Sequence, residues 1–130
     1  MEPGVYAITL HQGASWRKTF TFATANPDPT LDPIPINLTG CEVRMDIRTR
    51  AGAPDPALIS LSELPGPDGS LTLGGAAGTL VIHLTAAATN RLRIKKAVYD
   101  IFIEWSNGDV DKVVMGSVTI DPAVTEPTYD

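Results

Sequence analysis

The residues best suited to chemistry in this sequence do not form a catalytic or metal-binding set. His11 and His83 fall in separate predicted strands, and neither has an acidic residue or a cysteine at a ligand spacing such as i+2. Cys41 occupies an apolar-face position of a strand, which favours a small buried thiol over a nucleophile. No serine stands in a Gly-x-Ser-x-Gly motif. We therefore expect no enzymatic activity, no cofactor, no metal and no small-molecule substrate.

Two further motifs match ligand sites only in part. Asn107, Asp109 and Asp111 place oxygen atoms at alternate positions, as a calcium loop does, but the later Glu of that loop is absent. Asn-Gly-Asp is also the composition that a tight hairpin turn requires. The glycine-rich stretch 74–78 lacks the Lys-Ser/Thr pair of a phosphate-binding loop. We interpret both motifs as turns.

The charge balance argues against nucleic acid as a partner. The chain has 10 Lys and Arg against 15 Asp and Glu, a net charge of −5, whereas phosphate binding depends on clustered cations. The one basic cluster comprises Arg91, Arg93, Lys95 and Lys96. In an acidic protein, such a cluster is either a solvated rim or a docking patch for an acidic partner.

Length and composition predict one ordinary globular domain. The chain has 130 residues, of which 43% are hydrophobic and 19% charged, with 11 Gly and 11 Pro that favour many turns. Its single cysteine cannot form an internal disulfide. No apolar stretch approaches the roughly 20 residues that span a bilayer, and the start lacks the pattern of a signal peptide. We expect a protein that is made and kept soluble, without a membrane.

Period-two alternation predicts a sequence of short strands. The clearest pair is 97–105 and 110–120, which flank Ser106-Asn107-Gly108-Asp109 and should form an antiparallel hairpin. In the segment 41–48, apolar residues alternate with residues of alternating charge. Further strands are predicted at 5–11, 15–23, 57–62, 71–73 and 79–84. Thr85 can cap a short helix over 85–92.

These elements predict an all-β fold, an antiparallel immunoglobulin-like β-sandwich of about seven or eight strands with one short connecting helix. Tyr99 lies two residues before inward-facing Ile101, where immunoglobulin-type sandwiches place a corner tyrosine before a core cysteine. The sandwich should span 1–121, with an exposed proline-rich loop at 24–35 that is not part of a sheet, followed by a tail at 122–130. The predicted core comprises Ile8, Leu10, Phe20, Phe22, Val43, Met45, Ile47, Leu80, Ile82, Tyr99, Ile101 and Ile103.

Four segments together resemble a family of small bacteriophage virion proteins with immunoglobulin-like sandwiches, found among tail, baseplate and neck components. The matching segments are 8–15 with 20–22, 36–48, 73–80 with 84–86, and 99–101 with 116–120. The second contains Asn37-Leu38-Thr39-Gly40 before the strand of alternating charge. The order and spacing of the four, over Ile8 to Val124, carry the resemblance. Ala14, where an acidic residue is common, and the longer proline-rich loop depart from the family's pattern.

The resemblance implies a structural component of a virion, in the tail or baseplate. Such a protein would be synthesised in the cytoplasm of the bacterial host and would contact other virion proteins in multiple copies; the family implies no catalytic residues and no cofactor. A capsid decoration or neck protein is one alternative. Another is a receptor-binding or glycan-binding module, with Trp16, Trp105 and Tyr129 as the aromatic side chains available for stacking on sugars.

Attachment to neighbours is expected to use the irregular segments, because a small acidic sandwich has little apolar surface to spare. Prolines reduce the entropy lost when a segment is ordered, and exposed backbone can extend a neighbour's sheet. The residues predicted to contact partners lie in the proline-rich loop and the tail: Pro27, Pro29, Pro33, Pro122, Val124 and Tyr129.

Overall fold

The two apolar runs on either side of Asn107-Gly108 form the central hairpin of the fold, as predicted. In the computed structural model, which describes residues 2–125, these runs are β10 (Lys96–Glu104) and β11 (Val110–Asp121), paired antiparallel. Gly108 supplies the positive φ of the turn, 91°, and the Trp105 N–H donates to the Asp109 carbonyl at 2.8 Å. The alternation predicts the buried face of β10 correctly.

The larger sheet is built outward from this hairpin and is mixed. β10 lies between β11 and β6 (Glu42–Arg48), and β7 (Ile59–Ser62) forms the far edge, all antiparallel. On the other side, β1 (Gly4–Val5) and β2 (Ile8–His11) run parallel to β11. The expectation of a wholly antiparallel sandwich therefore fails at this edge. β1 and β2 precede the turn at 12–14 and belong to the larger sheet. After this turn the chain crosses to the second sheet, where it forms β3.

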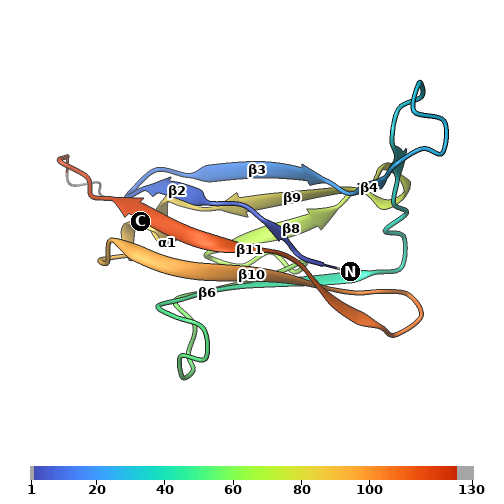
Figure 1. Ribbon diagram of the computed structural model, residues 1–130. Coiled ribbons are helices and arrows are strands. Elements are labelled where there is room, and N and C mark those ends of the chain that lie inside the picture. Colours follow the sequence, from blue (N-terminus) through green and yellow to red (C-terminus); the bar gives the residue numbers. More distant parts are fainter. Residues whose placement is uncertain (1, 126–130) are drawn as a thin grey trace.

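The second sheet has the order β3 (Trp16–Thr21), β9 (Thr79–Leu84) and β8 (Gly69–Leu73), all antiparallel. A 3₁₀ turn, Gly75–Ala77, joins β8 to β9. Two further strands, β4 (Ala23–Thr24) and β5 (Ile34–Pro35), pair only with each other. The two larger sheets face one another, and helix α1 (Ala86–Asn90) closes one end of the space between them (Figure 1). The all-β class is as predicted.

The core lies between the facing sheets, and it matches the predicted set except at two aromatic residues. Ten of the twelve predicted residues are buried, whereas Phe20 and Phe22 are only half-buried and pack against the core from its margin. Phe20 lies on β3, an edge strand paired on one side only, with β9, and Phe22 follows just after the end of that strand. The Tyr6 ring packs against this margin of the core and contacts the Phe20 ring edge-on, with 5.3 Å between the ring centroids. Cys41 is buried, as expected.

The N-terminal segment is fastened to the larger sheet at Tyr6, between β1 and β2. Its N–H donates to the Met115 carbonyl at 2.9 Å, and its carbonyl accepts from the Tyr99 hydroxyl at 2.7 Å. A Cβ at Gly116 would lie 2.1 Å from that carbonyl oxygen, so only glycine leaves room for it. The predicted tyrosine corner is therefore wrong, because the acceptor lies 93 positions upstream rather than a few.

Helix α1 rests on the end of the sandwich through polar contacts, which supports its predicted role as a connector. The Thr85 hydroxyl caps it by accepting from the Ala88 N–H at 3.2 Å. The buried Thr89 hydroxyl accepts from the Gly13 N–H at 3.1 Å and lies 2.8 Å from the Ala14 carbonyl. These bonds tie the helix to the β2–β3 turn.

Truncation of the central core residue Ile101 to alanine is expected to lower the free energy of unfolding by about 2–5 kcal/mol, because the site is fully buried and cannot collapse freely. Chemical denaturation of the purified domain measures this. Thr119→Ala, on the exposed face of β11, is the matched control and should change stability by less than about 0.5 kcal/mol. Equal effects of the two variants would show that the inward face is misassigned.

Tyr99 is expected to make stability depend on pH in the alkaline range. Burial, and next the proximity of Tyr6, raise the pKa of Tyr99 from 10.0 to about 12. The contribution of Tyr99 to the free energy of unfolding is therefore complete at pH values below its unfolded-state pKa. It is lost as the pH rises through its folded-state pKa. Tyr99→Phe should cost about 1 kcal/mol at neutral pH. The stability difference between wild type and variant should then narrow between pH 10 and 12, and a constant difference would contradict the shift.

Candidate functional site

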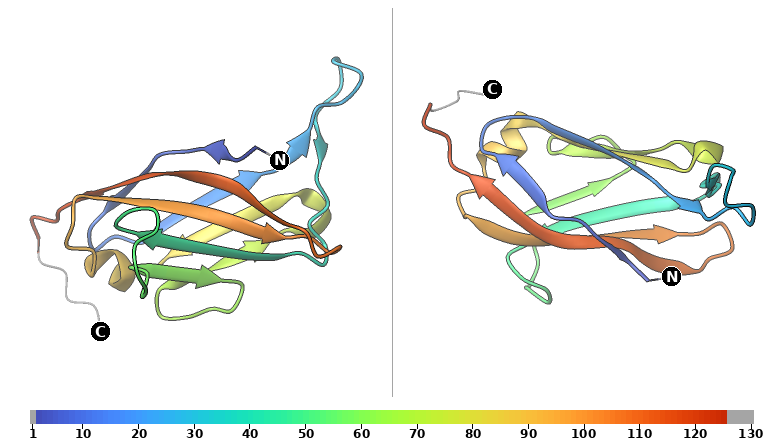
Figure 2. Two further views of the ribbon diagram at one scale, coloured as in Figure 1. Left: turned by 60° about the horizontal axis from the view of Figure 1, so that its bottom comes forward. Right: turned by 45° about the horizontal axis from the view of Figure 1, so that its top comes forward.

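The proline-rich segment forms a projecting arm, which we define as residues 23–35. Its two ends pair as β4 and β5, with Ala23 opposite Pro35 and Thr24 opposite Ile34. The rest of the arm extends beyond the two sheets at the end opposite α1 (Figures 1 and 2). The prediction of an exposed segment is confirmed, but the prediction that it contributes no strand is wrong. A ladder of two residue pairs requires few N–H donors, so proline can take part in it.

The base of the arm is held by the turn between β8 and β9. The Phe22 N–H donates to the Gly78 carbonyl at 2.8 Å, and the Ile36 N–H donates to the Phe22 carbonyl, also at 2.8 Å. Gly78 has a φ of 73°, and a Cβ there would lie 2.6 Å from the Phe22 oxygen. Both the conformation and the close approach therefore require glycine. The arm leaves the sandwich from a backbone anchor rather than from a loose hinge.

The tip of the arm is ordered by its own side chains. The Asn26 carboxamide oxygen accepts from the Asp28 N–H at 3.1 Å, and its amide donates to the Asp32 carbonyl at 3.3 Å. The Asp28 carboxylate accepts from the Thr30 N–H at 3.0 Å and from the Thr30 hydroxyl at 2.7 Å. The backbone bond first, then the hydroxyl bond, lowers the pKa of Asp28. Successive side-chain turns of this kind let an exposed segment keep one shape.

The arm presents apolar and acidic side chains to solvent. Pro27, Pro29 and Pro33, all predicted contact residues, are exposed on it. Leu31 is 58% exposed and Ile34 is 46% exposed, so the arm carries two large apolar side chains that face solvent. An extended proline-containing hairpin with apolar side chains is suited to binding a protein groove and offers no reactive group.

The other predicted contact residues lie at the opposite end, so the structure does not bring the two sets together. Pro122 and Val124 follow the end of β11, and the Val124 side chain is fully exposed. The Ala123 N–H donates to the Gln12 carboxamide at 3.1 Å, which fixes the start of the tail. Tyr129, also predicted to contact a partner, lies outside the described residues.

The basic cluster lies at the α1 end and is partly neutralised within the chain, which the sequence did not indicate. Arg91 donates to both carboxylate oxygens of Asp68, at 2.6 and 3.0 Å. This pairing raises the pKa of Arg91 above its ordinary value. Lys95 and Lys96 are exposed, and neither forms an ion pair within residues 2–125. The cluster therefore keeps cations that can meet an acidic partner.

A groove on the outer face of the larger sheet was not predicted at all. It has a volume of about 540 Å³ and lies over β6, β10 and β11, with Phe102 and Met115 among its lining residues. Its charges are largely paired within the protein, since Lys112 lies 3.4 Å from the Asp100 carboxylate. The groove thus offers a face of balanced charge rather than a binding site for an ion.

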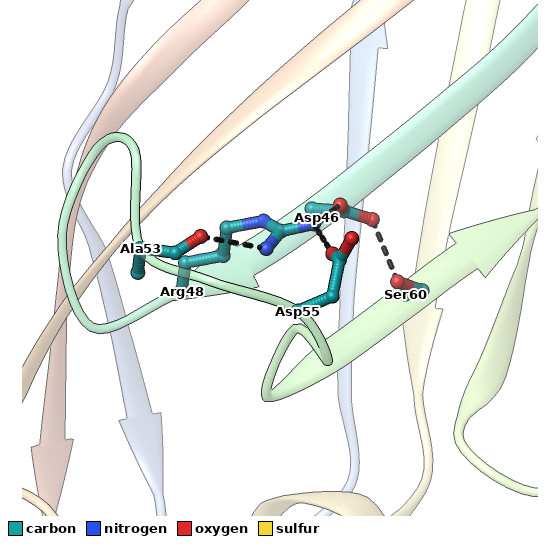
Figure 3. A network of polar contacts seen from close by, with 5 residues as sticks. All are labelled: Asp46, Arg48, Ala53, Asp55 and Ser60. Atoms are coloured by element: carbon teal, nitrogen blue, oxygen red, sulfur yellow. Dashed lines mark hydrogen bonds and ion pairs between the residues drawn. The ribbon is translucent and has the colours of Figure 1, made fainter.

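One wall of this groove is fixed by a polar network around Arg48 (Figure 3). The guanidinium donates to Asp55 at 2.6 Å, to Asp46 at 2.9 Å and to the Ala53 carbonyl at 3.0 Å. Ser60 on β7 completes it by donating to Asp46 at 2.7 Å. The bond to Asp55 and then that to Asp46 raise the pKa of Arg48. The network closes the β6–β7 loop and so acts on structure rather than on chemistry.

The motifs considered for calcium and for glycans have structural roles here. The Asn107 side chain accepts from the Asp109 N–H at 2.9 Å within the hairpin turn. Asp111 accepts from the Trp105 indole N–H at 2.7 Å. Trp105 and Trp16 are half-buried and pack against the core. Among residues 2–125, no group of three or more His, Cys, Asp and Glu side chains is placed to hold a metal ion.

Comparisons with known proteins do not assign the chain to a family. No family model matches it, and no curated protein matches it significantly. Within the part of the chain that the structure describes, no helix is long and apolar enough to cross a membrane.

Asp28 is expected to titrate below its ordinary pKa of 3.8, because its carboxylate accepts the two Thr30 bonds more strongly when it is ionised. The order it contributes is present above pH 3.8 and is lost as the pH falls through the depressed pKa. NMR titration of the carboxyl carbon measures the midpoint. Thr30→Ala keeps the backbone donor and should raise the midpoint only partly. A midpoint at or above the ordinary value in the wild type would contradict the bonding at the tip.

Proposed function

We propose that this protein is a structural component of a bacteriophage virion, in the tail or baseplate, and that the arm attaches it to neighbouring virion proteins. The observation that carries the proposal is the arm itself. It is an ordered, projecting hairpin that exposes Leu31 and Ile34 and is anchored to the sandwich by backbone bonds. Keeping such a segment exposed costs solubility, and a binding partner would offset that cost.

We further propose that the sandwich is immunoglobulin-like. The order β11, β10, β6, β7 in one sheet and β3, β9, β8 in the other corresponds to strands G, F, C, C′ and B, E, D of that fold. The first strand then pairs with the last, as β2 does with β11. This strand order supports the resemblance between the sequence and immunoglobulin-like virion proteins, because it arises from pairings that no local motif encodes.

The alternatives differ in how well the described residues support them. A capsid decoration or neck protein would use the same arm and would differ only in its position within the particle. A glycan-binding module would need exposed aromatic faces, whereas Trp16 and Trp105 are half-buried against the core. The indole N–H of Trp105 is already bonded to Asp111. No observation on the described residues favours glycan binding.

Removal of the arm is expected to abolish incorporation into particles without unfolding the sandwich. Residues 25–33 are replaced by Asn-Gly, which closes a two-residue turn between β4 and β5. The melting temperature should stay close to that of the wild type, because the deleted residues contribute nothing to the core. Mass spectrometry of purified virions then measures how much of the chain each particle contains.

A matched pair of point variants tests whether incorporation depends on the apolar surface of the arm or on any exposed apolar side chain. Leu31→Ser lies on the arm, whereas Leu64→Ser lies in the β7–β8 loop, where the leucine is 81% exposed. Only the first should lower incorporation. Absence of the wild-type chain from virions would refute the proposed function. If deletion of residues 123–130 abolished incorporation and deletion of the arm did not, the attachment element would be the tail.

A further inference from the structure

The two ends of the sandwich carry opposite charge. At the arm end, Glu42 on β6 stands directly opposite Glu104 on β10, a like-charge pair that costs stability in a sheet. Four further carboxylates belong to the same end, two on the arm and two beside the β10–β11 turn: Asp28, Asp32, Asp109 and Asp111. The cations Arg44 and Lys112 lie opposite Phe102, two residues inward along β10.

The α1 end is basic. Four cations lie within six positions between α1 and β10: Arg91, Arg93, Lys95 and Lys96. Within residues 2–125, Asp68 at this end is taken by Arg91, and Asp121 lies 3.4 Å from His11. The exposed Lys95 and Lys96 remain without an ion pair in the described part of the chain. Because the two ends are at opposite extremes of the sandwich, neither can neutralise the other within one molecule (Figure 1).

The two ends also complement each other in apolar surface. The arm exposes Leu31 and Ile34 beside its carboxylates. At the α1 end a groove of about 240 Å³ is lined by Leu92, Ile94 and Ile120, with Lys95 also among its lining residues. A short acidic and apolar hairpin meeting a basic and apolar groove satisfies both the charge and the hydrophobic requirements of a docking site.

We propose that the arm of one copy of this chain docks onto the α1 end of a second copy, head to tail. The inference rests on the proposed role of the arm as a contact element and names its partner. A contact of this kind joins two different surfaces, so a bound pair of copies still offers one free arm and one free groove. Repeated, it produces a closed ring or an open filament. Weak individual contacts suffice in such an array because each copy is held on two sides.

Sedimentation of the isolated protein tests this at about 1 mM, where a contact of only about 4 kcal/mol is half-populated. The wild type should self-associate at low ionic strength and dissociate as salt rises, because exposed charges are screened. Asp28→Asn with Asp32→Lys reverses the charge of the arm and keeps the side-chain acceptor at the tip. Lys95→Glu with Lys96→Glu replaces the two exposed lysines at the groove end by anions. Each double variant alone should lose self-association by at least about tenfold.

Mixing the two double variants gives the decisive result. The unaltered arm of the groove variant can bind the unaltered groove of the arm variant, and the reversed arm can bind the reversed groove, so the mixture should associate again into assemblies in which the two variants alternate. Combining all four substitutions in one chain should restore self-association, because the reversed charges again match. Symmetric pairing through the arm would instead leave the groove variant fully associated, and that outcome would overturn the proposal.

A wild-type protein that stays monomeric at low salt would also overturn the inference. The proposed function fails separately, since it depends on loss of the arm-deleted chain from virions and not on association in solution. All four substituted side chains are exposed, and none contributes to the core. Unchanged melting temperatures therefore serve as the control that the variants are folded.

Discussion

The arrangement of the whole molecule depends on the burial of one face of β10. This strand lies at the middle of the larger sheet, and Tyr99, Ile101 and Ile103 on its inner face are almost wholly inaccessible. Strand alternation then sends Asp100 and Glu104 to the outer face. A slip of one residue would bury those carboxylates and expose the isoleucines, at a cost of several kcal/mol for each unpaired charge. The register with β6 and β11 is thereby strongly specified.

That register determines where the charges lie. Because β6 and β10 align Glu42 with Glu104, the acidic residues collect at one end of the sheet, and the chain reaches its basic cluster only beyond the other end. The bulge in β11, where Val113 has no partner in the ladder, turns both Val113 and Val114 toward the interior. The separation of negative charge at one end of the molecule from positive charge at the other thus follows from how the core packs.

Features encoded by neighbouring residues could be predicted from the sequence. The hairpin at Asn107-Gly108, the alternation of β6 and the Thr85 cap all follow from local spacing and side-chain chemistry. The exposed character of the proline-rich segment was also predictable, since proline supplies no donor to a ladder. The arm's own short pairing was not, because it depends on the anchor at Gly78, which lies more than forty residues further along the chain.

Contacts between distant segments account for the remaining differences. Parallel pairing of β2 with β11 and the bond from Tyr99 to Tyr6 join residues separated by most of the chain. The half-buried state of Phe20 likewise reflects the position of β3 at a sheet edge, which periodicity does not reveal. Of the proposed contact surfaces, the sequence indicated the arm and the basic cluster separately. Only the fold places them at opposite ends.

The central claim is that this sandwich is built into a virion through its arm, and a cryo-EM reconstruction of the particle tests it most directly. The account predicts density for the sandwich in repeated copies, with residues 25–33 buried against a neighbouring subunit. Particles that contain the chain with its arm directed into solvent, or particles that lack the chain, would contradict it.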